Sequence, residues 1–239
     1  MQIIRALVVV SVLVGACAAC NGNGGSPDSR VVDIDNGSCG DQLRFTGEYV
    51  DWDFDVSSCG IGEATIEVSG DGAMDTTAPN GRFDLCIPSN VASVLLTVAQ
   101  PPGTSQCASP TSSHTVPTIL LANKEVIQAG GFFSGRAFTA ARQTTFFQAV
   151  GAAFDATKAH VFVHVNGTPR AVSLAAPHGP AQAIVATAWA AGDTGHDVFF
   201  PNVDVGGGET MLTVAGGAIG AGSIRLQAGT ITNVAVIAN

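Results

Sequence analysis

Short segments in which apolar and polar residues alternate, separated by glycine-rich turns, constrain this chain to a β-rich fold. The clearest alternation sets Val50, Trp52 and Phe54 against Asp51, Asp53 and Asp55. Successive side chains of a strand point to opposite faces, so this stretch predicts a strand with one buried face and one solvated acidic face. Further strands are expected at 31–34, 64–69, 82–87, 92–99, 118–121, 160–165, 183–190, 197–200, 210–215, 223–227 and 230–237.

The period changes between residues 138 and 154. Phe146, Phe147, Val150 and Phe154 recur at helical spacing, which predicts one amphipathic helix. This helix separates two β-rich stretches with a similar order of strands and turns. The paired segments are 65–70 with 161–167, 81–88 with 195–201, and 95–98 with 211–214. An approximate internal duplication is therefore expected.

One turn carries a family resemblance. The segment Thr77-Ala-Pro-Asn-Gly-Arg-Phe83 leads into a strand that ends at Pro88. Together with the strand from Ala64, it resembles the carboxypeptidase regulatory-like, or transthyretin-like, β-sandwich family, and 195–214 resembles it more faintly. The resemblance implies sandwich modules that space, stabilise or bind and that do not catalyse a reaction.

The predicted fold class is mainly β, with two Ig-like or transthyretin-like antiparallel β-sandwiches joined through one amphipathic helix. The expected parts are a lipoprotein signal peptide (1–16), a flexible tether (17–30), an N-terminal disulfide-bonded β-sandwich (31–127), a linker with the helix (128–157) and a C-terminal β-sandwich (158–239). The duplication also predicts that 81–98 and 195–214 each form a hairpin of their own sandwich. The side chains expected to point into two separate cores are Phe83 and Leu85 in the first, and Val198 and Phe200 in the second.

The N-terminal residues have the features of an export signal. Arg5 precedes an apolar run, 6–14, that has the length of a signal-peptide core and is too short to span a membrane. The run ends in Val14-Gly-Ala-Cys17, which resembles a bacterial lipobox, and the resemblance implies cleavage before an acylated Cys17. Cys20 is the alternative, because its acylation would leave an even number of cysteines for disulfides.

The charge of the chain is acidic and uneven. The formal net charge is −9, and residues 28–84 carry 13 acids and 3 bases whereas residues 85–239 carry 6 of each. Nucleic acids and anionic lipids are recognised by clustered Lys and Arg, so this distribution excludes binding to either by charge. The expected partners are the membrane, through the lipid anchor, and an envelope protein or glycan that the sequence does not identify.

Location follows from the same N-terminal features. We expect a lipid-anchored protein of the cell envelope. The residue after the acylated cysteine is Ala18 or Asn21 and not Asp, and by resemblance to sorted lipoproteins this implies the outer membrane.

Four cysteines follow the tether: Cys39, Cys59, Cys86 and Cys107. None has a close metal-ligand spacing, so in an oxidising compartment two disulfides are expected. Four cysteines allow three connectivities. We expect Cys39 with Cys59 and Cys86 with Cys107, and the other two pairings stay open.

Three groups of residues have the chemistry for a ligand site. Asp51, Asp53 and Asp55 offer carboxylates to Ca²⁺, but alternate residues of a strand are spread too far for one ion, and a solvated acidic face is the favoured interpretation. His160 and His164 share a strand face about 13 Å apart, too far for one zinc ion.

Trp189 precedes a Gly-Asp-Thr-Gly turn and is a candidate for stacking on a ligand near a sandwich end. The chain has no HExxH, GxSxG or P-loop motif. No catalytic residue and no cofactor are therefore expected.

The expected function is a lipid-anchored, non-catalytic structural or ligand-binding module of the cell envelope. The alternative is an envelope hydrolase, or a calcium-dependent carbohydrate- or peptide-binding protein, that uses the acidic N-terminal half.

Overall fold

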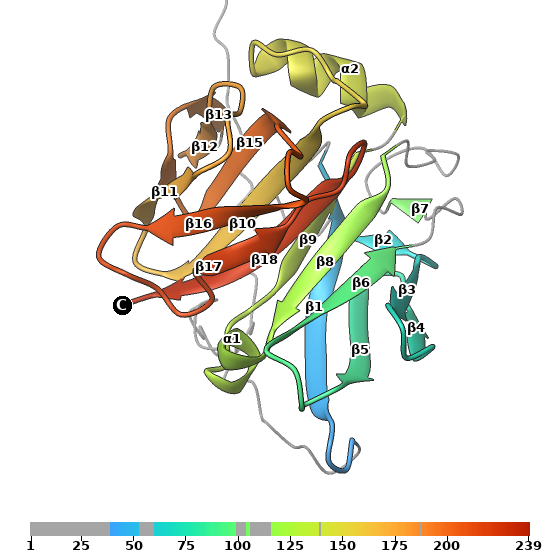
Figure 1. Cartoon of the computed structure of the whole chain (residues 1–239). Helices are drawn as coiled ribbons and strands as arrows, with labels where there is room; N and C mark the ends of the chain where they lie inside the picture. The colour runs from blue at the N-terminus through green and yellow to red at the C-terminus, as the bar shows by residue number, and fades with distance from the viewer. Residues whose placement is uncertain (1–38, 53–59, 99–103, 106–115, 139, 187) are drawn as a thin grey trace, which may run out of the picture. The chain divides into compact units, whose positions relative to one another are not determined.

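Strands dominate the computed structural model, which describes residues 39–52, 60–98, 104–105, 116–138, 140–186 and 188–239 (Figure 1). In the N-terminal half the elements are β1 (Leu43–Asp51), β2 (Ile61–Gly62), β3 (Thr65–Val68), β4 (Met74–Thr76), β5 (Arg82–Ile87), β6 (Ser93–Val98), β7 (Thr104–Ser105), β8 (Thr118–Asn123), α1 (Lys124–Gln128) and β9 (Ser134–Ala137). In the C-terminal half they are α2 (Ala140–Ala149), β10 (Ala159–Gly167), β11 (Arg170–Leu174), β12 (Gln182–Val185), β13 (Ala188–Ala191), β14 (Thr194–Gly195), β15 (Asp197–Val203), β16 (Glu209–Val214), β17 (Gly222–Arg225) and β18 (Ile231–Ala238).

One nine-stranded sheet joins the two halves, in the order β13-β12-β15-β10-β18-β8-β6-β3-β4. Its central strand β18 pairs in parallel with β10 on one side and with β8 on the other. The expectation that each half keeps a sheet of its own is therefore wrong. The reason is that both edges of β18 are hydrogen-bonded, one to each half.

Two smaller sheets complete the sandwiches, β5-β1-β9 in the N-terminal half and β14-β11-β16-β17 in the C-terminal half. The mainly β fold class is confirmed. Two apolar cores are also distinct, because β8 places Leu120 and Ala122 in the first core and Leu121 in the second. Neighbouring residues of a strand face opposite ways, so the two cores lie on opposite faces of the shared sheet.

The predicted hairpins do not form. Segment 81–98 leads from β5 in the three-stranded sheet to β6 in the nine-stranded sheet, and 195–214 leads from β15 to β16 in the four-stranded sheet. The pairing of the two stretches also differs, since β3 pairs with β6 whereas β10 pairs with β15. The inward positions are confirmed: Phe83 and Leu85 lie in the first core, and Val198 and Phe200 in the second.

Three pairings depart from the expected antiparallel arrangement. They are β1 with β9, β10 with β18, and β8 with β18, all parallel. Parallel neighbours need long crossover connections, and here the intervening chain supplies them.

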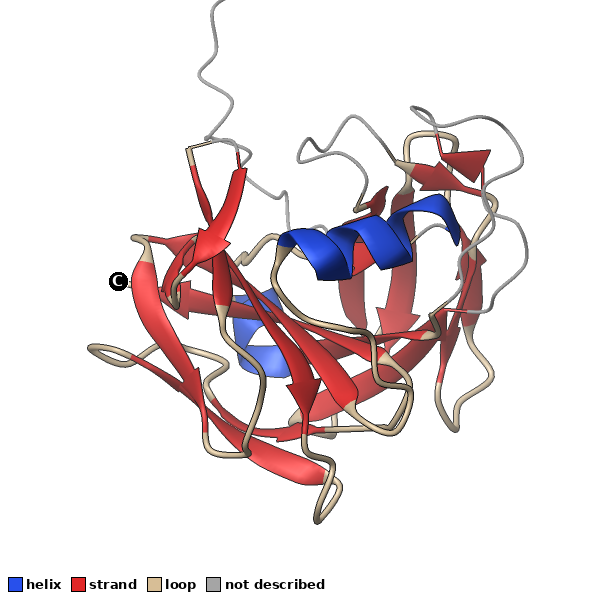
Figure 2. Ribbon diagram, turned by 90° about the horizontal axis from the view of Figure 1, so that it is seen from above, coloured by secondary structure: helices blue, strands red, loops and turns tan. Residues whose placement is uncertain are grey.

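Helix α2 is shorter than the predicted 138–154 and covers an aromatic cluster. Phe146 and Phe147 of α2 are buried against Trp52, Phe162 and Phe199. The helix lies at the upper end of the sheet in Figure 1 and at the front of the view from above in Figure 2. A helix in this part of the chain is therefore confirmed. No helix among the described residues has the length and apolarity needed to cross a membrane.

The disulfide links Cys39 to Cys86, with the two Cα atoms 5.5 Å apart. The expected pairing of Cys39 with Cys59 and Cys86 with Cys107 is therefore wrong. The antiparallel register sets Arg44 of β1 opposite Cys86 of β5. The turn that precedes β1, in which Gln42 N donates to Cys39 O at 3.1 Å, brings Cys39 back to Cys86. Cys59 and Cys107 lie outside the described residues.

Candidate functional site

A groove of about 610 Å³ lies where the four-stranded sheet ends and the N-terminal half begins. We call it the β17 groove. Its lining combines hydroxyl, amide, charged and apolar side chains from both halves: Ser69, Asp71, Pro88, Asn90, Val91, Ser93, Val94, Leu95, Leu121, Glu209, Ser223 and Arg225, with Gly70. Leu121 is buried and Leu95 half-buried, so these two give the groove an apolar floor.

The walls of the groove follow from local turn chemistry. Gly70 and Gly72 have φ values of 85° and 73°, a conformation that glycine adopts without steric cost, and they turn the chain between β3 and β4. The amide N–H of Ser69 donates to Leu95 O at 2.9 Å, which fixes that turn beside β6. On the opposite side β16 and β17 present Glu209, Ser223 and Arg225, all exposed.

Charges of both signs lie in this groove. Ser223 Oγ donates to Glu209 Oε2 at 2.8 Å. Arg225 is the register partner of Glu209 across β16 and β17, yet within the described part of the chain its guanidinium forms no ion pair. Arg225 and Asp71 are therefore available to a ligand, whereas Glu209 is already oriented by a hydroxyl.

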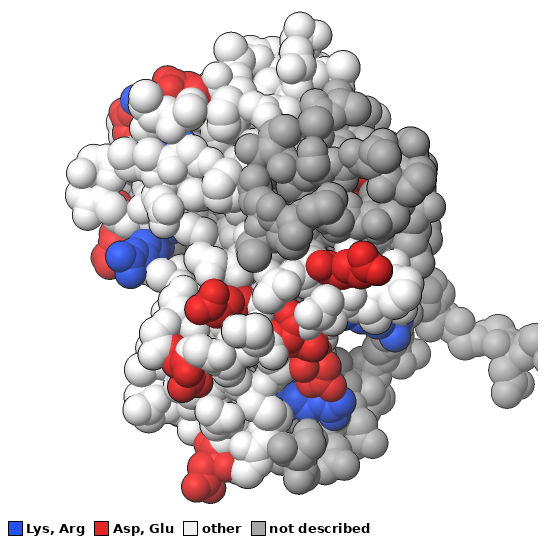
Figure 3. Space-filling view, turned by 90° about the vertical axis from the view of Figure 1, so that its right-hand side faces the viewer, with Lys and Arg blue, Asp and Glu red and all other residues white. Residues whose placement is uncertain are grey.

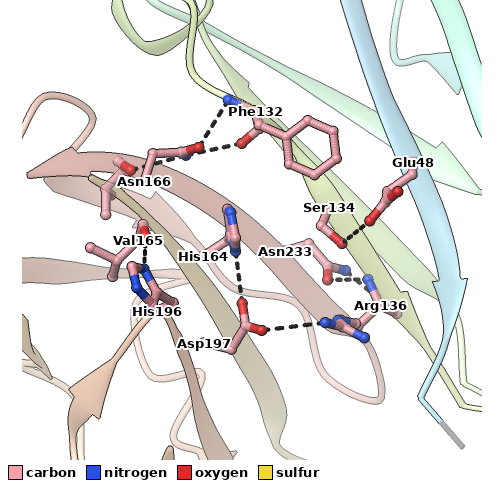
Figure 4. Close-up of polar contacts among 11 residues, drawn as sticks. Glu48, Phe132, Ser134, Arg136, His164, Val165, Asn166, His196, Asp197 and Asn233 are labelled. Carbon is pink, nitrogen blue, oxygen red and sulfur yellow. Dashed lines mark hydrogen bonds and ion pairs between the residues drawn. The ribbon is translucent and has the colours of Figure 1, made fainter. Parts of the chain in front are cut away.

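A second polar cluster lies on the opposite face of the nine-stranded sheet (Figure 4). Asp197 accepts from His164 Nδ1 at 2.7 Å and from an Arg136 Nη at 3.3 Å. The Arg136 guanidinium also lies over the Phe162 ring, 5.6 Å from its centroid, which adds a cation–π contact. Arg136 is buried and is held by Asn233, so the cluster joins β9 to β10, β15 and β18.

The electrostatics keep Asp197 ionised. Burial raises the pKa of the Asp197 carboxyl, but the hydrogen bond and charge of His164 and the charge of Arg136 outweigh burial, and the pKa lies below its usual value. His164 uses Nδ1 for Asp197 and leaves Nε2 for another group. A general base needs a hydroxyl or water within hydrogen-bond reach, and the nearby Ser134 hydroxyl donates to Glu48 at 3.2 Å instead.

His160 lies on the same strand face, two residues before Phe162, and is fully buried. Its Nδ1 accepts from Asn202 N at 3.1 Å, and burial lowers the pKa of His160 to about 4. The predicted shared face with His164 is confirmed. Its Nε2 has no hydrogen-bond partner among the described residues.

The prediction of a solvated acidic face on this strand is wrong for Asp51. This residue is fully buried, as are its neighbours Val50 and Trp52, because the end of β1 is enclosed on both faces. Asp53 and Asp55 lie outside the described residues. In the described ranges no three His, Cys, Asp or Glu side chains gather into a group that could hold a metal ion.

Trp189 lies on the edge strand β13 and is half-buried in the aromatic cluster. Its ring contacts Trp52 and Phe146, with centroids 5.7 and 5.6 Å apart. Ligand stacking by Trp189 stays a prediction. The acylation candidates Cys17 and Cys20 lie outside the described residues.

Comparisons with known proteins give little further information. No protein-family model matches the chain, and no curated protein matches it. Among solved structures, the Bacillus anthracis TIE protein is similar over 81% of this chain and 34% of that chain, at 9% identity and a TM-score of 0.22. The chain thus spans about a third of that protein. A TM-score this low supports no argument about fold or function.

Apart from His164, the sequence did not single out the residues of either site. Glu209, Arg225 and Asp71 are isolated charges on three separate elements, and His164 and Asp197 are 33 residues apart. The one available signal was a pair of charges, Glu209 directly before the predicted strand 210–215 and Arg225 within the next predicted strand, 223–227, which antiparallel pairing would bring together.

Proposed function

We propose that this chain is a lipid-anchored cell-envelope protein whose β-sandwiches act as a non-catalytic ligand-binding module. The observation that carries the binding role is the β17 groove, where Asp71 and Arg225 flank an apolar floor. Concave sites with an apolar surface and a few convergent polar groups are typical of ligand binding. The resemblance of the 64–88 segment to transthyretin-like modules supports a binding role without catalysis.

The lipid anchor rests on the lipobox-like segment that ends at Cys17. Acyl chains contribute about 0.8 kcal/mol per buried CH₂, so several chains on one cysteine hold a protein firmly on a bilayer. With Ala18 or Asn21 as the following residue, the proposed location is the outer membrane. Cys17→Ser should abolish palmitate labelling and membrane fractionation. Retained labelling that disappears in Cys20→Ser would assign the anchor to Cys20, and labelling of neither cysteine would overturn the anchor.

The binding role is tested with an array of envelope glycans and of peptides, probed with the full-length protein in detergent. Ser93→Trp places a bulky ring in the groove and should weaken ligand binding at least tenfold. Thr213→Trp adds the same ring to an exposed position of β16 outside the groove and should leave binding unchanged. A lack of any bound component, or equal binding by both variants, would contradict a ligand site in the groove.

A second candidate is an envelope hydrolase, favoured by the 2.7 Å hydrogen bond between His164 and Asp197. In such an enzyme Asp197 orients the imidazole and His164 Nε2 accepts a proton. The test is a panel of fluorogenic ester, glycoside and peptide substrates. Turnover that is lost in His164→Gln would establish the enzyme, and the absence of turnover would reject it.

A further inference from the structure

We infer that the β17 groove binds an extended, basic peptide segment of an envelope partner, which adds as a further strand to the open edge of β17. The inference rests on the proposed binding role of this groove and names its ligand. In strand addition, main-chain hydrogen bonds provide affinity while alternate side chains provide specificity.

The open edge of β17 follows from the hydrogen-bond pattern. β17 is the terminal strand of the four-stranded sheet. Leu226 N donates to Gly208 O at 2.8 Å, and antiparallel residue pairs alternate between bonded and non-bonded. The register pairs Ile224 with Thr210, so Ile224 bonds to β16. The backbone groups of Ser223 and Arg225 therefore point away from β16.

One of these groups has a partner within the fold, since Thr232 Oγ1 donates to Arg225 O at 3.4 Å. The N–H and C=O of Ser223 and the N–H of Arg225 have no hydrogen-bond partner within the described part of the chain and are directed at the open edge. They recur at every second residue, which is the spacing that a neighbouring strand requires.

The groove lies beside this edge. Ser223 and Arg225 line it, and Leu95 and Leu121 form its floor. A strand lying about 4.8 Å from β17 would place every second side chain over the apolar floor and the others toward solvent. Exposed strand edges are liable to pair with another strand, and a strand added at this edge would lie along the groove.

The charges around the groove favour a basic partner. Among the described residues that line the groove, Asp71 and Glu209 are acidic and Arg225 is the one cation. The adjoining N-terminal half is acidic, and the face shown in Figure 3 carries more acidic than basic side chains. With a net charge of −9 on the whole chain, electrostatic attraction favours Lys and Arg on the incoming strand. A second copy of this chain would bring like charges together.

The probe is the octapeptide acetyl-Lys-Val-Lys-Thr-Lys-Val-Lys-Thr-amide, and its binding to the full-length protein in detergent is measured by isothermal titration calorimetry. Its analogue with Glu in place of Lys should bind at least tenfold more weakly. Two further analogues carry backbone N-methyl groups on alternate residues, one analogue on its odd-numbered residues and the other on its even-numbered residues. Strand addition predicts that one of these two analogues binds at least tenfold more weakly than the parent peptide and that the other retains its binding.

Protein variants locate the binding. Glu209→Lys should weaken binding of the basic peptide at least fivefold, whereas Glu125→Lys, an equal charge change at an exposed position of α1, should leave it nearly unchanged. Ser223→Pro removes an edge N–H and should weaken binding at least tenfold. Its fold is checked by circular dichroism, and the N-methyl peptides give the same information without altering the protein.

The outcomes separate this inference from the binding role itself. Equal effects of Glu209→Lys and Glu125→Lys, or indifference to N-methylation, would show general charge attraction and overturn strand addition. A glycan ligand that Ser93→Trp removes, with no peptide binding, would overturn the peptide inference and leave the proposed function standing. Dimerisation that Ser223→Pro abolishes would assign the edge to a second copy and likewise overturn the inference. Failure of both probes would reject inference and function together.

Discussion

The Asn233 side chain on β18 hydrogen-bonds to both backbone groups of Arg136 on β9. Oδ1 accepts from Arg136 N at 2.7 Å, and Nδ2 donates to Arg136 O at 3.4 Å. The amide thus occupies the place of a strand neighbour for β9 and connects the three-stranded sheet to the shared sheet. Asn233 is fully buried, so bulk solvent does not reach these hydrogen bonds.

Asn233→Leu should lower the free energy of unfolding by about 3 kcal/mol, because it removes two hydrogen bonds to buried backbone groups. Urea denaturation measures the change. Asn90→Leu, at an exposed position, serves as the control and should shift stability by less than about 0.5 kcal/mol. Equal stability of both variants would show that β9 is held by other contacts.

The Cys39–Cys86 bond predicts a defined peptide map and a stability cost. Proteolysis without reduction should release a fragment that joins the peptides of these two cysteines. Cys39→Ala combined with Cys86→Ala should cost about 4 kcal/mol in the chain-entropy account of a bond with a sequence separation of 47. Reduction of the wild-type protein should bring its stability toward that of the variant. A fragment joining Cys39 to Cys59 would contradict this pairing.

Gly60 is predicted to tolerate no side chain. A Cβ on Gly60 would lie 2.0 Å from the carbonyl carbon and oxygen of Asn80, and backbone atoms cannot move aside cheaply. Gly60→Ala should therefore destabilise the protein by about 3 kcal/mol. Gly206, where a Cβ would meet nothing within 4 Å, gives the matched control Gly206→Ala. Thermal melting that shows no difference between the two would refute the close approach.

His160 predicts a loss of stability in mild acid. Burial lowers its pKa from 6.5 to about 4, so between these values the unfolded chain binds a proton that the folded chain does not. Stability is then complete above about pH 6.5 and falls as the pH drops toward 4, by about 3 kcal/mol in total. His160→Gln should flatten this slope in urea titrations at pH 4.5 to 7.

The exposed His178 provides the control for this titration. His178→Gln should keep the wild-type slope. Measurements stay above pH 4 because Asp197, whose pKa is lowered, contributes stability that is lost only at more acidic pH. An unchanged slope in His160→Gln would assign the acid sensitivity to another group.

Local patterns predicted most strands but not their partners. Period-two alternation placed β5, β6, β16 and β18 within a residue or two of their observed bounds. The predicted strand 183–190 is instead two strands, because Ala186 has a φ of 59° and turns the chain. Strand β9 was missed since Ser134-Gly-Arg-Ala has no apolar alternation, and its burial depends on contacts with distant β18.

The candidate sites were beyond local patterns for the same reason. The β17 groove depends on which strand forms the edge of the four-stranded sheet. The residues of β17 do not by themselves indicate that β17 is this edge strand. The burial of Asp51 likewise comes from the elements that enclose β1, whereas its alternation with Val50 and Trp52 indicated a solvated face. A functional motif could be recognised from the sequence only where its residues are adjacent in the chain, as in the lipobox-like segment.

The position of β18 at the centre of the nine-stranded sheet has a consequence for the order of folding. β18 (Ile231–Ala238) follows every other described strand in the chain, yet it holds the two halves together. During synthesis, strands β8 and β10 therefore cannot pair with β18 until residues 231–238 have left the ribosome. The nine-stranded sheet is therefore incomplete at its centre while the strands that precede β18 are being synthesised.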